Sequence, residues 1–213
     1  MSTRTTGITM ILCLAVAFVA SAHFYPTLPA QLPSHWNAEG VVDGMLPKFW
    51  ALFLSPFVMA MLFLLWAAIP FMEPLQDNLE KFRSGYNALF LTLQAFFLYE
   101  FVLIMLTALG HHFNLAQALA PALAVLLAAI AAVTKNSERN FFVGIRTPWT
   151  LASDEVWRKT HILGSWLIYF CALCCLAAAF APSLLFALII FPLGITILTT
   201  VIYSYVEFRH ERV

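Results

Sequence analysis

KNSERNFFVGIRTPWTLASDEVWRKTH, residues 135–161, is a polar and basic stretch between two long apolar runs. It holds five of the eleven Lys and Arg residues of a chain that is 62% hydrophobic and only 10% charged. An ordinary soluble domain has about 25% charged residues. One water-soluble core could not bury this much apolar surface behind so few polar side chains. The composition therefore predicts a polytopic membrane protein in which this stretch is a loop.

Apolar runs on both sides of the loop predict the fold class. Each run is long enough, at about 1.5 Å per residue, to cross a hydrocarbon core of about 30 Å with some tilt. We expect an all-α membrane fold, a bundle of six transmembrane helices, with a tight helical hairpin at Pro182 because the two last runs are too long for one crossing. The six runs are 7–25, 49–72, 88–109, 117–134, 162–181 and 183–206.

The basic residues predict the orientation of the bundle. Ten of the eleven Lys and Arg side chains fall in the N-terminal tail, residues 73–87, residues 135–161 and the C-terminal tail, whereas the opposite set of loops has only Lys48. Cytoplasmic loops carry an excess of Lys and Arg. We therefore expect both termini and the loop at 135–161 in the cytoplasm, and residues 26–48 outside.

The first apolar run also has features of a cleaved signal peptide. Arg4 supplies a basic start, and Ala-Ser-Ala at 20–22 resembles a small-residue cleavage site. We favour a retained helix, because the run is long for a signal peptide and the aromatic residues at 23–25 follow it as at a membrane interface.

The first half of the polar loop suggests a clamp. Gly144 indicates close backbone approach or a positive φ. Arg146, beside a Thr147-Pro148 turn, is suited to clamp an anion or a backbone carbonyl. The alternative is an interfacial turn in which Trp side chains such as Trp149 anchor the chain at the headgroups and Arg binds lipid phosphate.

The second half of the loop predicts the start of a helix. Ser153 is a capping residue, and the two acids that follow it suit the positive end of a helix. Trp157 and His161 are four residues apart and share one face of that helix. We expect Trp149, Trp157 and Trp166 near the headgroup level.

Specific residue types recur through this loop in the pattern Asn140-x-x-x-Gly144-Ile145-Arg146-Thr147-Pro148-Trp149-Thr150-Leu151-x-Ser153-x-x-Val156-Trp157-x-x-Thr160-His161. The pattern resembles the signature of the SdpI-type immunity family. That resemblance implies a multi-pass protein of the bacterial cytoplasmic (inner) membrane. It also implies resistance to a secreted peptide toxin and a relay that holds a winged-helix repressor at the cytoplasmic face. We expect partner or lipid binding by Asn140, Gly144, Arg146, Thr147, Trp149, Ser153, Trp157 and His161.

The predicted outward loop has a second pattern, Leu32-Pro33-x-His35-Trp36-Asn37-x-x-Gly40-x-x-Asp43-Gly44-x-x-Pro47-Lys48. It resembles the uncharacterised N-terminal domain that often precedes the SdpI-type region. Prolines exclude a helix here, and the Gly40 and Asp43-Gly44 turn signals favour a small hairpin. The site residues that we expect in this loop are His35, Trp36, Asn37, Gly40, Asp43 and Lys48.

These two resemblances predict how the chain is divided. Residues 1–87 form an N-terminal two-helix unit with a Pro-rich outward loop and an inner connector. Residues 88–213 form an SdpI-like region of four helices that contains the loop at 135–161.

Outward His and acidic residues raise the alternative of a metal site, which would suit zinc and a metal-dependent membrane enzyme. His35, Glu39 and Asp43 are four apart, but the prolines and glycines around them exclude the helix that would align them. The Cys residues at 13, 171, 174 and 175 lie in apolar runs and are expected to be packing residues. We expect no metal and no cofactor.

Two polar residues are expected inside the membrane, Gln94 and Glu100. A carboxylate at that depth is costly and should face the bundle interior. It is either a structural hydrogen-bonding group or part of a proton or substrate path in a small transporter or channel. No nucleophile–base pair or phosphate loop is present in the sequence, which disfavours an enzyme. The zero net charge argues against nucleic acid as a direct partner.

Overall fold

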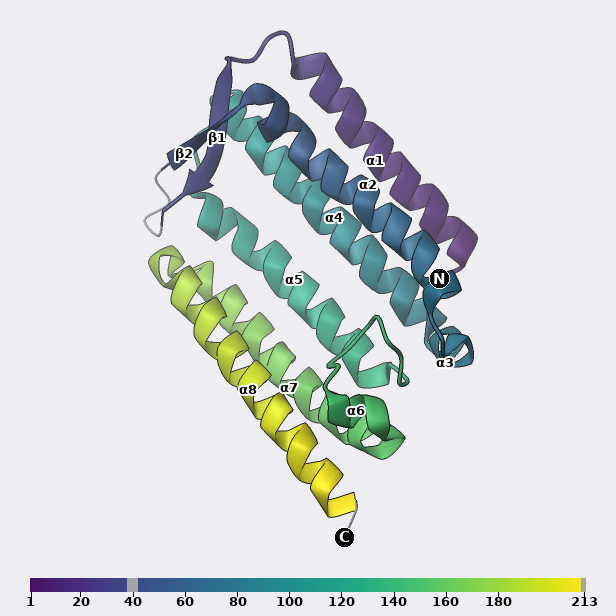
Figure 1. Cartoon of the computed structure of the whole chain (residues 1–213). Helices are drawn as coiled ribbons and strands as arrows, with labels where there is room; N and C mark the ends of the chain where they lie inside the picture. The colour runs from purple at the N-terminus through teal and green to yellow at the C-terminus, as the bar shows by residue number, and fades with distance from the viewer. Residues whose placement is uncertain (38–41, 212–213) are drawn as a thin grey trace.

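The structure, a computed structural model, describes residues 1–37 and 42–211 of the chain. In this part of the chain, six long helices form a bundle, and a small hairpin lies at one end of it (Figure 1). The predicted all-α membrane fold is confirmed. The long helices are α1 (Thr3–Phe24), α2 (Lys48–Met72), α4 (Arg83–Ala108), α5 (Leu115–Asn136), α7 (Asp154–Ala178) and α8 (Leu185–Glu211). The shorter elements are β1 (Gln31–Trp36), β2 (Val42–Pro47), α3 (Gln76–Lys81), α6 (Pro148–Ala152) and η1 (Pro182–Leu184).

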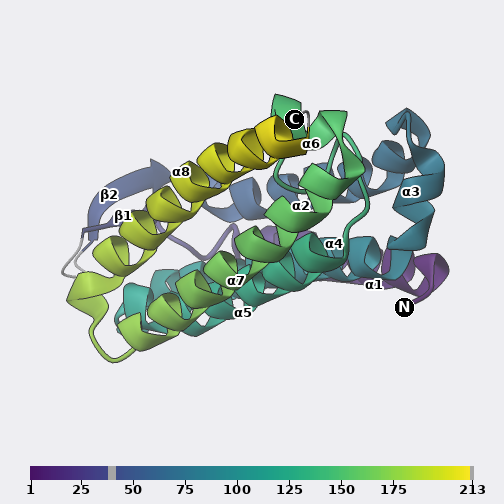
Figure 2. The ribbon, with the colours of Figure 1, turned by 90° about the horizontal axis from the view of Figure 1, so that it is seen from below.

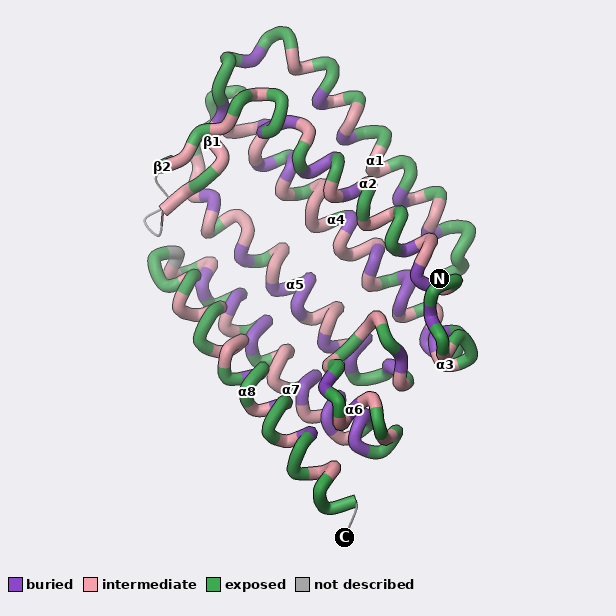
Figure 3. Tube along the Cα trace, viewed as in Figure 1, coloured by how far each residue is buried: buried purple, intermediate pink, exposed green. Residues whose placement is uncertain are grey.

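The outer surface of the bundle is apolar. Each long helix buries only part of its length inside the protein, as the alternation of buried and exposed stretches along the trace shows (Figure 3). Large side chains such as Phe71 of α2 and Phe186 of α8 remain exposed. Soluble proteins rarely leave such extended apolar surface in contact with water. This surface therefore faces lipid, and the chain is a multi-pass membrane protein.

The helices form two groups of three. α1, α2 and α4 pack together, α7 lies between α5 and α8, and the contact of α4 with α5 joins the two groups (Figure 1, Figure 2). η1 connects α7 to α8, which returns along α7. The predicted helical hairpin at this position is confirmed.

Polar side chains fasten the first group where water is absent. Ser21 Oγ donates a hydrogen bond to the Leu52 carbonyl (2.8 Å), which links α1 to α2. Trp66 Nε1 donates to Asn87 Oδ1 (2.9 Å), which links α2 to α4. Gln94 is fully buried and donates from Nε2 to a carbonyl of α1 (3.3 Å). Inside a bilayer such groups have no water to bind, so these contacts favour this one packing.

The polar segments divide between the two ends of the bundle. Both ends of the described chain, α3 and α6 lie at one end, and β1 and β2 lie at the other (Figure 1). The segments that are rich in Lys and Arg therefore share one end of the molecule. Only the charge distribution assigns that end to the cytoplasm.

The hairpin is present, but the turn predicted at Asp43-Gly44 is wrong. Asp43 and Gly44 lie within β2 rather than between the strands, and Gly44 pairs with His35 across an irregular antiparallel register. A Cβ on Gly44 would lie 2.8 Å from the Cβ of His35, so the glycine permits close strand approach here. Gly40 and Glu39 lie outside the described residues.

Candidate functional site

Asn140 organises the start of the polar loop. Its side chain is fully buried, and its Oδ1 accepts hydrogen bonds from the backbone N–H groups of Phe142 (2.9 Å) and Val143 (2.6 Å). Its Nδ2 donates to the carbonyls of Glu138 (2.8 Å) and Val143 (2.9 Å). One amide group thus satisfies four backbone groups that no helix or strand would satisfy. Asn140 holds the shape of the loop and is not available to an outside partner.

His161 and Trp157 of α7 form a pair of stacked rings against which Gly144 packs, here called the floor of the loop. The two rings stack with their centroids 3.9 Å apart, and both are almost completely buried. The Ile145 N–H donates to His161 Nε2 (2.9 Å), so the proton of the neutral ring lies on Nδ1, which contacts the Trp157 carbonyl (2.8 Å). Trp157 Nε1 donates to the Ser137 carbonyl (2.8 Å). Each polar atom of this pair therefore has a backbone partner.

Gly144 is the residue that lets the loop lie on this floor. It has a φ of +124°, and a Cβ at this position would overlap His161 Nε2 and approach the Trp157 ring to 3.1 Å. The expected positive φ and close approach are both confirmed. The loop covers the Trp157 ring, so this side chain does not contact lipid directly, and its place near the headgroup level stays a prediction. Trp166, by contrast, is exposed on α7.

The Thr147-Pro148 turn starts the short helix α6. Thr147 caps it in a reciprocal arrangement with Thr150, and Thr147 Oγ1 also donates to Ser204 Oγ of α8 (3.1 Å). Trp149 packs edge-on against Tyr205, with centroids 5.1 Å apart. α6 is therefore held against α8 by one hydrogen bond and one aromatic contact.

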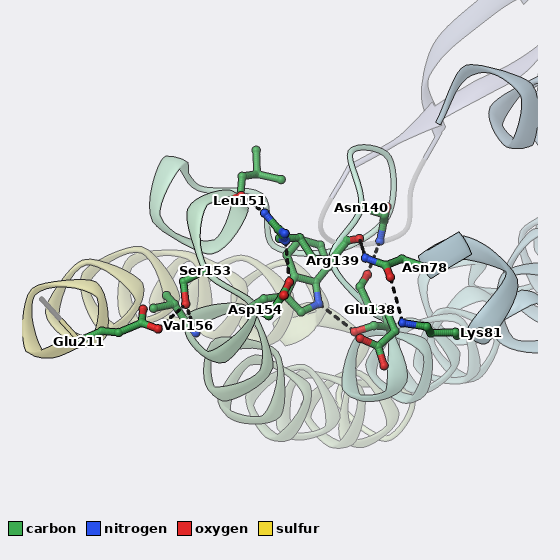
Figure 4. Close-up of polar contacts among 12 residues, drawn as sticks. Asn78, Lys81, Glu138, Arg139, Asn140, Leu151, Ser153, Asp154, Val156 and Glu211 are labelled. Carbon is green, nitrogen blue, oxygen red and sulfur yellow. Dashed lines mark hydrogen bonds and ion pairs between the residues drawn. The ribbon is translucent and has the colours of Figure 1, made fainter. Parts of the chain in front are cut away.

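Two arginines fasten the loop in different ways. Arg146 is exposed and donates from Nη1 to the Phe141 carbonyl, which is one of the two clamp roles expected for it. Arg139 donates from Nε to Asp154 Oδ1 (2.6 Å) and from Nη1 to the Leu151 carbonyl (2.8 Å) (Figure 4). Arg139 thereby joins the start of the loop to the start of α7.

The start of α7 is capped as expected. Ser153 Oγ accepts a hydrogen bond from the Val156 N–H (3.3 Å). The same hydroxyl donates to Glu211 Oε1 at the end of α8 (2.9 Å) (Figure 4). Ser153 therefore connects the two last helices at this end of the bundle.

The structure adds Glu73, which nothing in the sequence singles out. Its side chain is almost completely buried just after α2. Oε1 accepts the Leu75 N–H and Oε2 accepts the Phe141 N–H, each at 2.9 Å. Asn78 Nδ2 makes a second link from this connector to the loop, donating to the Arg139 carbonyl (2.9 Å) (Figure 4). The connector and the polar loop are thus one hydrogen-bonded unit, here called the inner platform, residues 73–81 and 137–153.

The expected outward residues are more exposed than those of the inner platform. His35 Nδ1 contacts Asp43 Oδ1 across the hairpin at 2.5 Å, with both side chains open to solvent. Lys48 Nζ donates to the carbonyls of Tyr25 (3.0 Å) and Leu28 (3.3 Å). Its ammonium group also lies 4.5 Å from the centre of the Tyr25 ring. Lys48 is thus a structural group that secures the chain entering the hairpin.

A cavity of about 560 Å³ lies between the hairpin and helices α4, α5 and α8. Trp36, Asn37 and Glu100 are among its lining residues. Glu100 Oε2 accepts a hydrogen bond from Ser55 Oγ of α2 (2.6 Å). The cavity brings the two expected regions, the outward loop and the intramembrane carboxylate, to one place. We call it the hairpin cavity.

Metal-binding geometry is not seen in the part of the chain that the structure describes. No group of three His, Cys, Asp or Glu side chains there is arranged to hold an ion. The four cysteines are free thiols, and Cys171 and Cys175 are buried between helices.

Known proteins resemble this chain in two segments, one that contains the polar loop and one that contains the hairpin. Residues 136–204 match the SdpI/YfhL protein family, and residues 12–60 match a domain of unknown function, DUF1648. This segment of the chain is thus similar to the SdpI/YfhL protein family. The chain is also 23% identical over 203 residues to the immunity protein SdpI of Bacillus subtilis (strain 168), which covers 93% of this chain and 95% of that protein. No solved structure matches the chain.

The segment that matches the SdpI/YfhL family contains every residue that we expected to act in the polar loop, from Asn140 to His161. The DUF1648 region contains both strands of the hairpin and Lys48. Glu73, Gln94 and Glu100 fall between the two regions. With six apolar helices and this likeness to a Bacillus protein, the chain is a multi-pass bacterial membrane protein.

Proposed function

We propose that this chain is a membrane immunity protein that protects the cell against a secreted peptide toxin. The observation that carries the proposal is the likeness to the immunity protein SdpI along 93% of the chain, which includes both polar ends of the bundle. The fold agrees with it, because a membrane-active peptide acts where this protein resides.

We propose that the secreted peptide binds at the hairpin end of the bundle. The distribution of Lys and Arg assigns that end to the outside, where a secreted peptide arrives first. The exposed His35 and Asp43 and the hairpin cavity lie there, and apolar helix surface continues from them into the bilayer. A peptide that inserts into the membrane can contact both.

We assign relay or lipid binding to the inner platform. Its buried residues hold a fixed shape, whereas Arg146 is exposed on its surface with Nη1 bound to the Phe141 carbonyl. An exposed guanidinium on a rigid loop suits lipid phosphate or an acidic patch on a cytoplasmic regulator, such as a small winged-helix repressor. Asn140, Thr147, Trp157 and His161 would then support the surface rather than touch the partner.

Survival of a sensitive bacterium tests the proposal. Cells that express the chain are challenged with a panel of secreted membrane-active peptides and compared with cells that carry an empty vector. We expect protection against at least one peptide, and reduced protection for Arg146→Ala at an unchanged membrane level. Arg209→Ala, which changes a basic residue at the same end but outside the loop, is the matched control and should protect normally. Equal survival with and without the chain across the panel would contradict the immunity role.

A small transporter or channel is the second candidate, favoured by the position of Glu100 on the hairpin cavity. In that case Glu100→Gln abolishes proton-coupled flux into vesicles and leaves peptide protection unchanged. The metal-dependent enzyme has no comparable support among the described residues. Zinc that binds the purified chain and is lost on His35→Ala would revive it.

A further inference from the structure

The hairpin cavity has the size and lining of a ligand site. Its volume of about 560 Å³ falls within the range of about 300–1,000 Å³ that is usual for ligand pockets. Ile104, Leu119 and Ile189 supply aliphatic walls from three different helices. The polar part of the lining consists of Glu100 and residues of the hairpin strand β1 and its end. An apolar chain with one polar group matches this distribution.

The cavity can be reached from the bilayer. Phe186 and Ile190 of α8 belong to its lining, and both are substantially exposed, at 71% and 49%. Because α8 is one of the membrane-spanning helices, these exposed side chains face lipid. A molecule already dissolved in the membrane could thus enter between α4 and α8 beneath the hairpin.

Charge selects the ligand. Glu100 contributes a carboxylate to the lining, and no Lys or Arg lines the cavity in the described part of the chain. His35 also belongs to the lining, and its imidazole is paired with the carboxylate of Asp43. The Ser55 hydroxyl donates to Oε2 but brings no positive charge. A carboxylate in an apolar setting is stabilised by a cation and repels anionic groups. Anionic fatty chains and phosphate-bearing headgroups are therefore poor ligands for this place.

We propose that the hairpin cavity binds an apolar chain that carries one ammonium group, as a lysine side chain of a membrane-inserted peptide provides. The ammonium group pairs with Glu100, and the apolar part lies along Leu119 and Ile189. This inference rests on the proposed immunity role for the source of the ligand, a secreted peptide. It adds the feature of that peptide that the protein recognises.

Photolabelling of the full chain in phosphatidylcholine nanodiscs tests the chemistry. The probe is dodecylamine with a photoreactive group at the chain end, compared with the matched alcohol and carboxylic acid. We expect the amine to label α4, α5 or α8 around the cavity, and the alcohol and the acid to label these sites about tenfold less, the factor that corresponds to about 1.4 kcal/mol. Equal labelling by all three probes would overturn the inference.

Variants locate the effect. Glu100→Gln keeps the side-chain shape and should reduce amine labelling to the level of the alcohol, whereas Glu80→Gln, an exposed carboxylate on α3, should leave it unchanged. Leu119→Trp fills the cavity with Glu100 in place and should abolish labelling by every probe. Thermal unfolding in the same nanodiscs confirms that each variant is folded. If the amine probe labels Glu100→Gln as strongly as the natural sequence, the ammonium group does not pair with Glu100. This result holds even if Leu119→Trp fails to fold.

Competition tests the peptide as the source. A short apolar peptide with one central lysine should compete with the amine probe, and the same peptide with norleucine in place of lysine should not. Equal competition by the two peptides overturns recognition of the lysine. The survival assay separates this result from the wider proposal. Protection that persists in Glu100→Gln defeats only the cavity inference, whereas labelling that depends on Glu100 without protection against any peptide defeats only the immunity role.

Discussion

Gly144→Ala is the change that most sharply tests how the inner platform is built. The residue has a φ of +124°, and a Cβ there would meet His161 and the Trp157 ring. The strained backbone costs a residue with a side chain about 1–3 kcal/mol. Overpacking against two buried rings adds about 1–3 kcal/mol. We therefore expect Gly144→Ala to destabilise the loop by about 2–6 kcal/mol.

Limited trypsin cleavage after Arg146 measures this cost. The next residue, Thr147, is buried and hydrogen-bonded, so cleavage requires local opening of the loop. When opening and closing are fast, the cleavage rate follows the open population, and 1.4 kcal/mol changes that population about tenfold. We expect Gly144→Ala to be cleaved at least about thirtyfold faster than the natural sequence.

Alanine substitutions at two other glycines are the controls. They distinguish the local effect at Gly144 from a general effect of replacing glycine with alanine. Gly110 also has a positive φ, +91°, but nothing lies within 4 Å of a Cβ there, and it lies away from the loop. Gly194 in α8 has neither a positive φ nor a close neighbour. Ala at either position should leave cleavage after Arg146 unchanged. Cleavage of Gly144→Ala at the rate of these controls would refute the packing that we describe.

Three further predictions concern other polar contacts. Glu73→Gln weakens the hydrogen bonds to this carboxylate by about 1.5–3 kcal/mol, so tryptic cleavage after Arg139 should become faster. An unchanged cleavage rate would show that the connector does not hold the loop in place. His161→Phe leaves the Ile145 N–H without its acceptor, at a cost of about 1–3 kcal/mol, so the midpoint of thermal unfolding in nanodiscs should fall, and an equal midpoint is the contrary result. Lys48→Met removes two hydrogen bonds to carbonyls, about 1 kcal/mol each, and should speed hydrogen exchange just before β1, whereas unaltered exchange there would mean that the lysine is dispensable.

The fold could be predicted from the sequence because its signals are local. Long apolar runs determine which segments cross the membrane, and Pro182 separates the two last runs. The Ser153 cap marks the start of α7 to the residue. The glycine at position 144 indicates a positive φ, since few other residues tolerate one. These features depend on neighbours in the chain, which the sequence displays directly.

The arrangement of the site depends on contacts between distant residues, and these could not be predicted. Glu73 accepts a hydrogen bond from Phe141, far along the chain, and no motif surrounds Glu73 to suggest it. The hairpin cavity likewise needs β1, α4, α5 and α8 together. The Asp43-Gly44 turn failed for a related reason, because pairing with β1 draws this dipeptide into a strand.

The proposed division of labour requires that the hairpin end faces outward and the inner platform faces the cytoplasm. The four natural cysteines lie within the membrane-spanning helices, so an added cysteine at either end can be labelled selectively. Asp43→Cys and Arg146→Cys are each treated in cells with a maleimide that does not cross the membrane. We predict that Asp43→Cys is labelled in intact cells and that Arg146→Cys is labelled only after permeabilisation. The reverse pattern would place the inner platform where a secreted peptide arrives and would contradict the account.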